Sequence, residues 1–243
     1  MNKMFNIDTG RKFYSSPYFI YGFGLILLLI SSYLCLFHGG PSNAFDDATM
    51  SLIIKDIRLP KLIASILAGA CLSLAGFVFQ AVLRNPLADP YILGVSSGAA
   101  LGTALYVIFF GSLFGILGAK IFSFTGSITA VLILMIIYRI MSKNTSALIL
   151  AGVAISLFFS SIITFLMSSI EGSRLLYLSS WLIGSVSSPD SLELYFLLFT
   201  LLIGLFILIL FANVLDLMRF GDEFAVSSGV NSNAYMLLFI ITA

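Results

Sequence analysis

Residues 84–90 read Arg84-Asn85-Pro86-Leu87-Ala88-Asp89-Pro90, a polar stretch with two prolines that separates two long apolar runs. Each proline removes a backbone donor and pushes the residue before it out of helical geometry, so a turn is expected here. The run before it, residues 62–83, contains no charged residue. A helix of that length can cross a hydrocarbon core of about 30 Å. The pattern predicts a tight turn between two membrane-spanning helices, at one face of a bilayer.

The composition is that of an integral membrane protein. Hydrophobic residues make up 60% of the 243 residues and charged residues only 9%. So few polar side chains cannot cover the surface of a soluble globule of this size. The formal net charge of +1 provides no basic surface for nucleic acid. Cys35 and Cys71 both lie in apolar runs, where buried thiols are expected, and they indicate no redox compartment.

Uncharged apolar runs predict an all-α, polytopic transmembrane helix bundle with six complete spans and the start of a seventh. The six runs are residues 17–37, 62–83, 91–110, 121–138, 147–170 and 194–215. The first run is too long for the apolar region of a signal peptide. We place the N-terminus in the cytoplasm, because the cytoplasmic loops then hold the larger share of Lys and Arg residues.

The seventh run, residues 235–243, would form only about 13 Å of helix at 1.5 Å per residue, which cannot cross a bilayer. We expect either a fragment of a longer protein or a natural truncation whose last segment stays at the interface. No linker or repeat divides the chain, so residues 1–243 are predicted to form a single membrane-embedded domain.

A stripe of glycines marks the third run. Gly94, Gly98 and Gly102 recur at intervals of four, which places them on one face of a helix. Small residues let another helix backbone approach closely. The spacing predicts a helix-packing surface, as is common in compact membrane bundles.

The chain lacks the residues that most other function classes require. None of the six runs contains a charged residue or histidine, whereas proton-coupled carriers place such groups inside the membrane. The one histidine, His38, has no second ligand at metal-binding spacing, so no metal site is predicted. No phosphate-binding loop or catalytic triad occurs, so an enzyme is not expected and any nucleotide must be bound by another subunit. A passive pore and a partner-driven transporter both remain.

Several blocks occur in the order of one transporter family. They are Arg58-Leu59-Pro60-Lys61, Gln80, residues 84–90, Leu93-Gly94-Val95-Ser96-Ser97-Gly98-Ala99-Ala100, Leu150-Ala151-Gly152-Val153-Ala154, Trp181-Leu182-Ile183-Gly184-Ser185, Gly221-Asp222-Glu223 and Gly229-Val230-Asn231. Over about residues 18–243 the chain resembles permeases of the ABC importers for iron–siderophore complexes, haem and vitamin B12.

The resemblance implies a multi-pass protein of the bacterial cytoplasmic membrane, with ten transmembrane helices per subunit. It implies a second permease copy or a related permease, an ATPase subunit dimer and an external substrate-binding lipoprotein or periplasmic protein as partners, within membrane lipid. ATP and Mg would be bound by the ATPase, with no cofactor in this chain. The resemblance also implies that three more helices follow the part of the family fold that this sequence matches.

The resemblance also implies sites at both membrane faces. Arg58 and Lys61 match the basic pair that docks the external binding protein, although they could also be interfacial cations at a helix start. The positions that match the cytoplasmic gate are Asn85, Leu87, Thr145 and Ser146. These four are also ordinary turn formers or turn neighbours.

A third segment, residues 219–233, matches the region that contacts the ATPase in the family. The matching residues are Gly221, Asp222, Glu223, Ala225 and Gly229. Asp222 and Glu223 would also favour the dipole of a short helix that begins there. Ser228 departs from the family, in which leucine is common at that position.

The chain is accordingly predicted to be the permease of an importer for ferric siderophores that works by alternating access and has no catalytic residues. A haem or vitamin B12 permease is the alternative within the family. A passive channel and a non-transporting fragment are the alternatives outside it.

Overall fold

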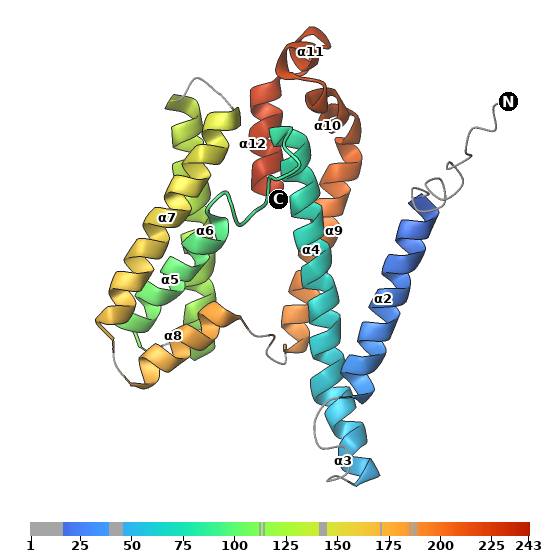
Figure 1. Cartoon of the computed structure of the whole chain (residues 1–243), viewed down its shortest axis with the longest axis vertical. Coiled ribbons are helices and arrows are strands. Elements are labelled where there is room, and N and C mark those ends of the chain that lie inside the picture. The colour runs from blue at the N-terminus through green and yellow to red at the C-terminus, as the bar shows by residue number, and fades with distance from the viewer. Residues whose placement is uncertain are drawn as a thin grey trace, which may run out of the picture. The chain divides into compact units, whose positions relative to one another are not determined.

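The computed structural model describes residues 17–38, 46–111, 113, 115–140, 145–170, 172–184, 186 and 189–243. Every regular element in these residues is a helix, as the apolar runs predict (Figure 1). In chain order they are α2 (Pro17–Phe37), α3 (Asp47–Leu52), η1 (Ile53–Arg58), α4 (Leu59–Leu83), α5 (Val95–Phe109), α6 (Gly115–Ile140), α7 (Thr145–Ser168), α8 (Ser173–Ile183), α9 (Ser191–Leu210), α10 (Ala212–Arg219), α11 (Asp222–Ser227) and α12 (Ser232–Thr242).

Five of the described helical stretches are long and apolar enough to cross a membrane. They are Tyr18–Phe37, Ala48–Leu83, Gly115–Ile140, Ala147–Ser168 and Ser191–Leu210. They correspond to five of the six predicted runs. The stretch Gly115–Ile140 is longer than the predicted run at residues 121–138 and includes Lys120 and Arg139 near its two ends. The charge-free region is therefore the middle of that helix rather than all of it.

Two predicted runs are divided or shortened by local backbone conformation, and one helix was not predicted. The third run, residues 91–110, yields only α5, because residues 91–94 form a turn that ends at Gly94 with φ +85°. The sixth run, residues 194–215, breaks at Phe211, where φ −109° and ψ 19° end α9 and a separate α10 begins. The amphipathic helix α8 was not predicted, because its polar residues interrupt the apolar run.

The chain divides into two compact units. One comprises Met1–Ile66 with Val186–Leu194, and the other comprises Leu67–Ser185 with Tyr195–Ala243. In the first unit α2 lies against η1, and the Arg58 Nη1 atom donates a hydrogen bond of 2.7 Å to the Leu36 carbonyl near the end of α2. This bond satisfies one of the carbonyl groups that a helix end leaves without an intrahelical partner.

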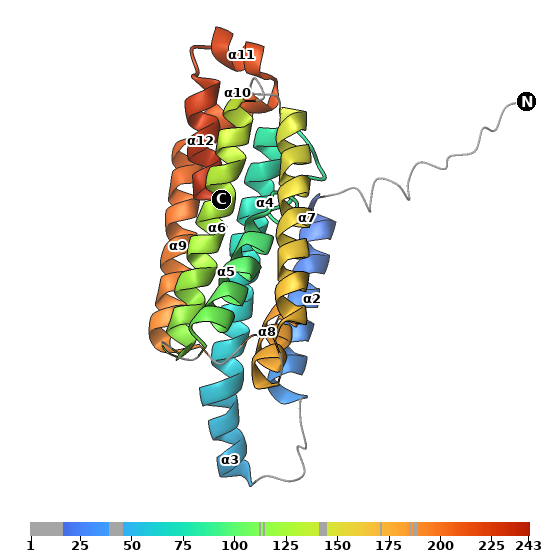
Figure 2. The ribbon, with the colours of Figure 1, turned by 90° about the vertical axis from the view of Figure 1, so that its left-hand side faces the viewer.

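The core of the second unit is built around α5, which packs against α6 and α7 (Figure 2). A Cβ atom added to Gly98 would lie 2.6 Å from the Gly126 carbonyl oxygen, and one added to Gly102 would overlap the Phe122 carbonyl. The two backbones therefore touch where these glycines lie, which is the close approach that small residues permit. Gly94 is not part of this face, because it lies ahead of α5 and faces Ile155 of α7.

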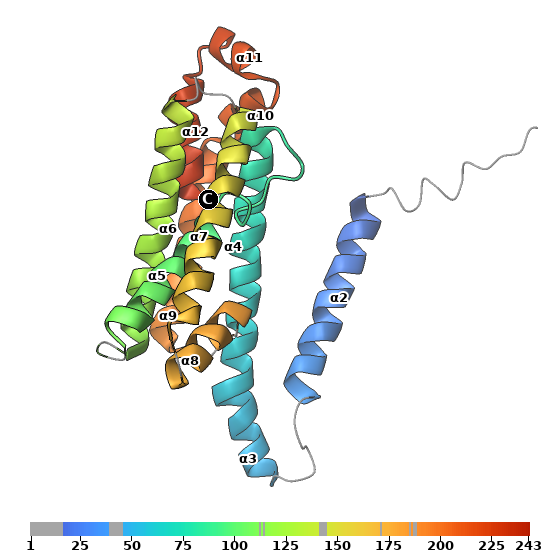
Figure 3. The same ribbon diagram turned by 60° about the vertical axis from the view of Figure 1, so that its left-hand side comes forward.

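Within the second unit, one end carries the elements that the sequence assigns to the cytoplasm. The end of α4, the end of α6, the start of α7 and α11 lie toward this end, and α8 lies toward the other (Figure 3). Buried side chains from α4, α6, α10 and α12 form one hydrophobic cluster that includes Phe79, Leu134, Met218 and Phe239. This cluster holds the short helices near the end of α4, where the candidate site lies.

Candidate functional site

The turn after α4 is a helix-terminating motif with an unusual residue at its critical position. The Asn85 N–H donates to the Gln80 carbonyl at 3.3 Å, and Arg84 between them has φ +51°. This is the Schellman arrangement, in which the left-handed position is normally glycine. Arg84 is the only non-glycine residue with positive φ among those that the structure describes. Holding a side chain in this region costs about 1 kcal/mol or more.

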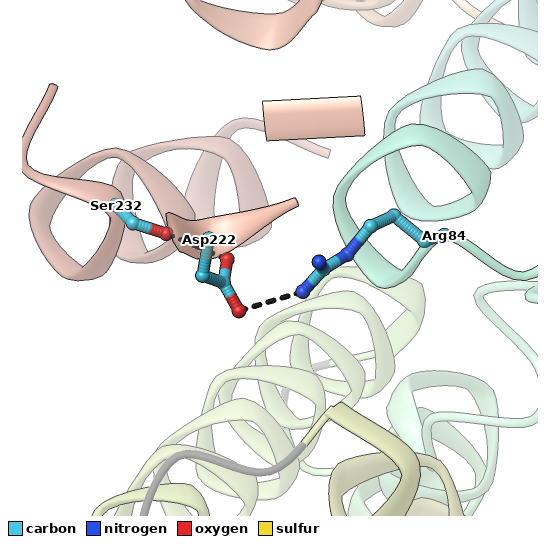
Figure 4. A network of polar contacts seen from close by, with 3 residues as sticks. All are labelled: Arg84, Asp222 and Ser232. Carbon is cyan, nitrogen blue, oxygen red and sulfur yellow. Dashed lines mark hydrogen bonds and ion pairs between the residues drawn. The ribbon is translucent and has the colours of Figure 1, made fainter. Parts of the chain in front are cut away.

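The Arg84 side chain makes an ion pair with the first residue of α11. Its Nη2 atom lies 2.6 Å from Asp222 Oδ2, and the Ser232 hydroxyl at the start of α12 donates to Asp222 Oδ1 at 2.8 Å (Figure 4). The two charged side chains are 29% and 44% exposed, so water screens the pair only in part. One carboxylate thus connects the turn after α4 with the starts of α11 and α12.

Helix α11 is shaped by three of the residues that the sequence assigns to ATPase contact. Gly221 precedes it with φ +123°, Ala225 is fully buried, and Gly229 after it has φ +82°. The Val230 N–H donates to the Ala225 carbonyl at 2.9 Å, which makes a second Schellman turn, this time with glycine at the left-handed position. These three residues fix the helix and its ends rather than present side chains to a partner.

Apolar side chains are exposed on α11 and directly before it. Phe224 is 49% exposed, Val226 62% and the preceding Phe220 77%, and the rings of Phe220 and Phe224 lie 5.6 Å apart. Glu223 is exposed beside them. The three apolar residues were not predicted, because they are not part of the family pattern. Two phenylalanines four residues apart around a polar Gly-Asp-Glu stretch were the available signal.

The predicted gate residues of the first loop lie in a stiff turn. The Asn85 Oδ1 atom accepts a hydrogen bond of 2.9 Å from the Leu87 N–H, and Asp89 Oδ1 accepts one of 2.7 Å from the Tyr91 N–H. Asn85 therefore uses its side chain to form the turn, whereas Leu87 is 76% exposed. Farther along, the loop lies against α7, where a Cβ atom on Gly152 would be 2.8 Å from the Ile92 carbonyl oxygen.

The remaining predicted site residues lie at the starts of α4 and α7 and at the end of η1. Thr145 and Ser146 are the first two residues of α7, but their side chains lie outside the described part of the chain. Arg58 uses its guanidinium group to bond the Leu36 carbonyl, as described above, and Lys61 is half-buried in the first turn of α4. One member of the predicted docking pair therefore also bonds the end of α2.

A cavity of about 330 Å³ lies beside the turn after α4. It is lined by Gln80, Arg84, Asn85 and Arg219, with apolar side chains around them. Both arginines are paired with a carboxylate, Arg84 with Asp222 and Arg219 with Asp216 at 3.7 Å. Each arginine of the cavity wall thus has a carboxylate partner, and neither carboxylate lines the cavity itself.

Comparisons with known proteins agree with this architecture. The model of the FecCD transport family matches residues 21–243. An uncharacterized ABC transporter permease protein, YvrB of Bacillus subtilis, is 36% identical over 208 residues, covering 83% of this chain and 58% of the relative. The Fe(3+)-citrate import system permease protein YfmE of the same organism is 35% identical over 198 residues, covering 81% and 59%.

A solved structure has the same fold. It shows an inward-facing conformation of a protein assigned to the metal-chelate type of ABC transporter, with a TM-score of 0.74 and 29% sequence identity. The match covers 93% of this chain and 72% of that one. The chain spans somewhat more than half the length of the two Bacillus relatives.

Proposed function

The chain belongs to the FecCD transport family, and from this premise we propose that the protein is the membrane permease subunit of an ATP-driven importer for ferric siderophores. The match of the family model over residues 21–243 is the observation that carries the proposal. The names of the two similar proteins, a metal-chelate type transporter and a ferric citrate permease, support an iron chelate as the substrate class. Haem or vitamin B12 is the second candidate substrate within the family.

The proposed mechanism is alternating access between an external binding protein and the cytoplasm. In the proposed orientation the protein lies in the bacterial cytoplasmic membrane with its N-terminus in the cytoplasm. The turn after α4 and helix α11 then face the cytoplasm, and Arg58 and Lys61 face outward. The exposed Phe220, Phe224 and Val226 around α11 are suited to enter an apolar cleft on an ATPase subunit. ATP and Mg would be bound in that partner, and a second permease would complete the pathway.

Cellular uptake tests the substrate class. Cells that lack the protein should lose most of the uptake of the radiolabelled chelate that it serves, and a plasmid copy should restore it. Ferric citrate, a ferric hydroxamate siderophore, haemin and cyanocobalamin are compared in parallel. Loss confined to the iron chelates is the expected result. Loss confined to haemin or cyanocobalamin would replace the proposed substrate with the second candidate.

Docking of the binding protein tests the outer face. We expect Lys61→Glu to weaken binding of the external binding protein about tenfold, because a rim charge that meets a carboxylate becomes repulsive. Lys61 is the better position for this test, since replacing Arg58 would also remove its bond to the Leu36 carbonyl. Binding is measured by surface plasmon resonance on the permease in nanodiscs.

Lys55→Glu is the matched control for docking. Lys55 is exposed in η1, close in sequence to the predicted pair, and its reversal changes the net charge by the same amount. Equal losses for Lys55→Glu and Lys61→Glu would show a general electrostatic effect and would remove Lys61 from the docking site.

A further inference from the structure

We infer that the Arg84–Asp222 ion pair is the positioning link that carries movement of α11 to the turn after α4. The inference rests on the proposed function, because α11 is there the contact with the ATPase. The two residues are 138 positions apart in sequence, yet their charged atoms lie 2.6 Å apart. One end of the link lies in the proposed contact helix, and the other directly precedes the proposed gate residues Asn85 and Leu87.

The backbone of Arg84 supports a role for its side chain. Both α4 and α11 end in a Schellman turn, and α11 has Gly229 at the left-handed position. Glycine adopts that conformation without a steric penalty, whereas arginine does not. Since glycine would make the better turn after α4, what Arg84 adds there is its guanidinium group, which bonds Asp222.

Asp222 is placed to transmit displacement. It is the first residue of α11, and both of its carboxylate oxygens are engaged, one by Arg84 and the other by Ser232. Ser232 is buried at the start of α12, so the carboxylate cannot turn away from Arg84 without losing a second bond. A shift of α11 therefore displaces the Arg84 side chain through the ion pair.

The turn is stiff enough to pass the displacement on. Pro86 and Pro90 fix two of the φ angles in the turn. The carboxamide of Asn85 and the carboxylate of Asp89 each accept a hydrogen bond from a backbone N–H group two residues further along the chain. Its far end lies against Gly152 of α7. A displacement of Arg84 therefore also displaces the exposed Leu87 and is transmitted to α7. Helix α7 begins with the other two predicted gate residues.

The chain offers a matched control pair beside the link. Arg219 and Asp216 lie 3.7 Å apart within α10, with side chains 57% and 67% exposed, and they connect no separate elements. Asp216→Asn removes the same kind of charge near the same cavity. Arg84→Gly and Asp222→Asn break the link itself. Arg84→Gly also relieves the left-handed strain, so the turn is retained in that variant.

The experiment uses the full-length permease, alone in detergent and as the complex that co-purifies with its ATPase from the native membrane. In the permease alone, Arg84→Gly and Asp222→Asn should each raise amide hydrogen exchange in residues 85–94 about fivefold, with no further rise in the double variant. In the complex, the Arg84→Gly variant should retain ATPase binding while the ATP hydrolysed per ferric citrate imported rises about tenfold. Asp216→Asn should change neither quantity.

The outcomes separate the two proposals. If the wild-type permease neither binds an ATPase nor supports ATP-dependent uptake, the proposed function is wrong, and the role of the link in coupling falls with it. If wild-type uptake is normal but amide exchange in residues 85–94 is unchanged in both variants, the link does not hold the turn. If exchange rises while the ratio of ATP to substrate stays at the wild-type value, the ion pair only stabilises the fold. Each of the last two results overturns the inference and leaves the proposed function intact.

Discussion

Replacing both Phe220 and Phe224 with alanine is expected to weaken binding of the ATPase subunit by about a hundredfold or more. The two rings are 77% and 49% exposed and lie 5.6 Å apart, so they form an apolar projection at α11. Aromatic residues that fill a partner's pocket typically contribute about 2 kcal/mol or more each to binding. The helix itself should persist, because the buried Ala225 and the turn at Gly229 are unchanged.

The measurement is the amount of ATPase that co-purifies with the permease, followed by titration of the purified subunits. Phe109→Ala is the matched control, because Phe109 is 71% exposed at the end of α5, away from α11. Wild-type affinity in the double variant would contradict the assignment of α11 as the contact. A loss of the same size in the Phe109 variant would show that the assay reports general damage.

Gly102→Ala is expected to destabilise the second unit by about 3 kcal/mol. The added methyl group would overlap the Phe122 carbonyl, which belongs to the backbone of α6 and cannot rotate out of the way. The two helices must separate to make room, and the packing of α5 against α6 is lost with them. The measurement is the midpoint of thermal unfolding in detergent, supported by the amount of protein recovered from the membrane.

Gly69→Ala is the control for the glycine contact. Gly69 lies in α4, and a Cβ atom at this position would have no neighbour within 4 Å. Alanine also has the higher helix propensity, so stability should stay the same or rise slightly. If Gly102→Ala were as stable as Gly69→Ala, the close contact between α5 and α6 would not exist in the folded protein.

The long helices could be predicted from sequence because apolar length alone determines them. The run at residues 17–37 coincides with α2, and the run at 147–170 differs from α7 by two residues at each end. The turn at residues 84–90 was predicted from its prolines and is present. The predicted helix ends were wrong where the backbone conformation of a single residue ends a helix. The φ of +85° at Gly94 shortens α5, and the break at Phe211 divides the sixth run.

The candidate site could be predicted only in part. The spacing of Gly98 and Gly102 indicated a contact face but not its partner, because Gly126 lies on another helix. The pairing of Arg84 with Asp222 joins residues 138 positions apart, and no local pattern reports such a contact. Some of the residues that match the family's ATPase-contact pattern shape α11, and others are exposed on it. Only the burial of each side chain distinguishes the two groups.

Transport by the reconstituted protein tests the central proposal most directly. The permease, its co-purified ATPase and the external binding protein are placed in liposomes, and uptake of radiolabelled ferric citrate and a ferric hydroxamate siderophore is followed with and without ATP. We predict uptake that requires ATP and the binding protein and that stops when ATP hydrolysis is blocked with vanadate. Equal flux without ATP or without the ATPase would identify a passive channel and contradict the account.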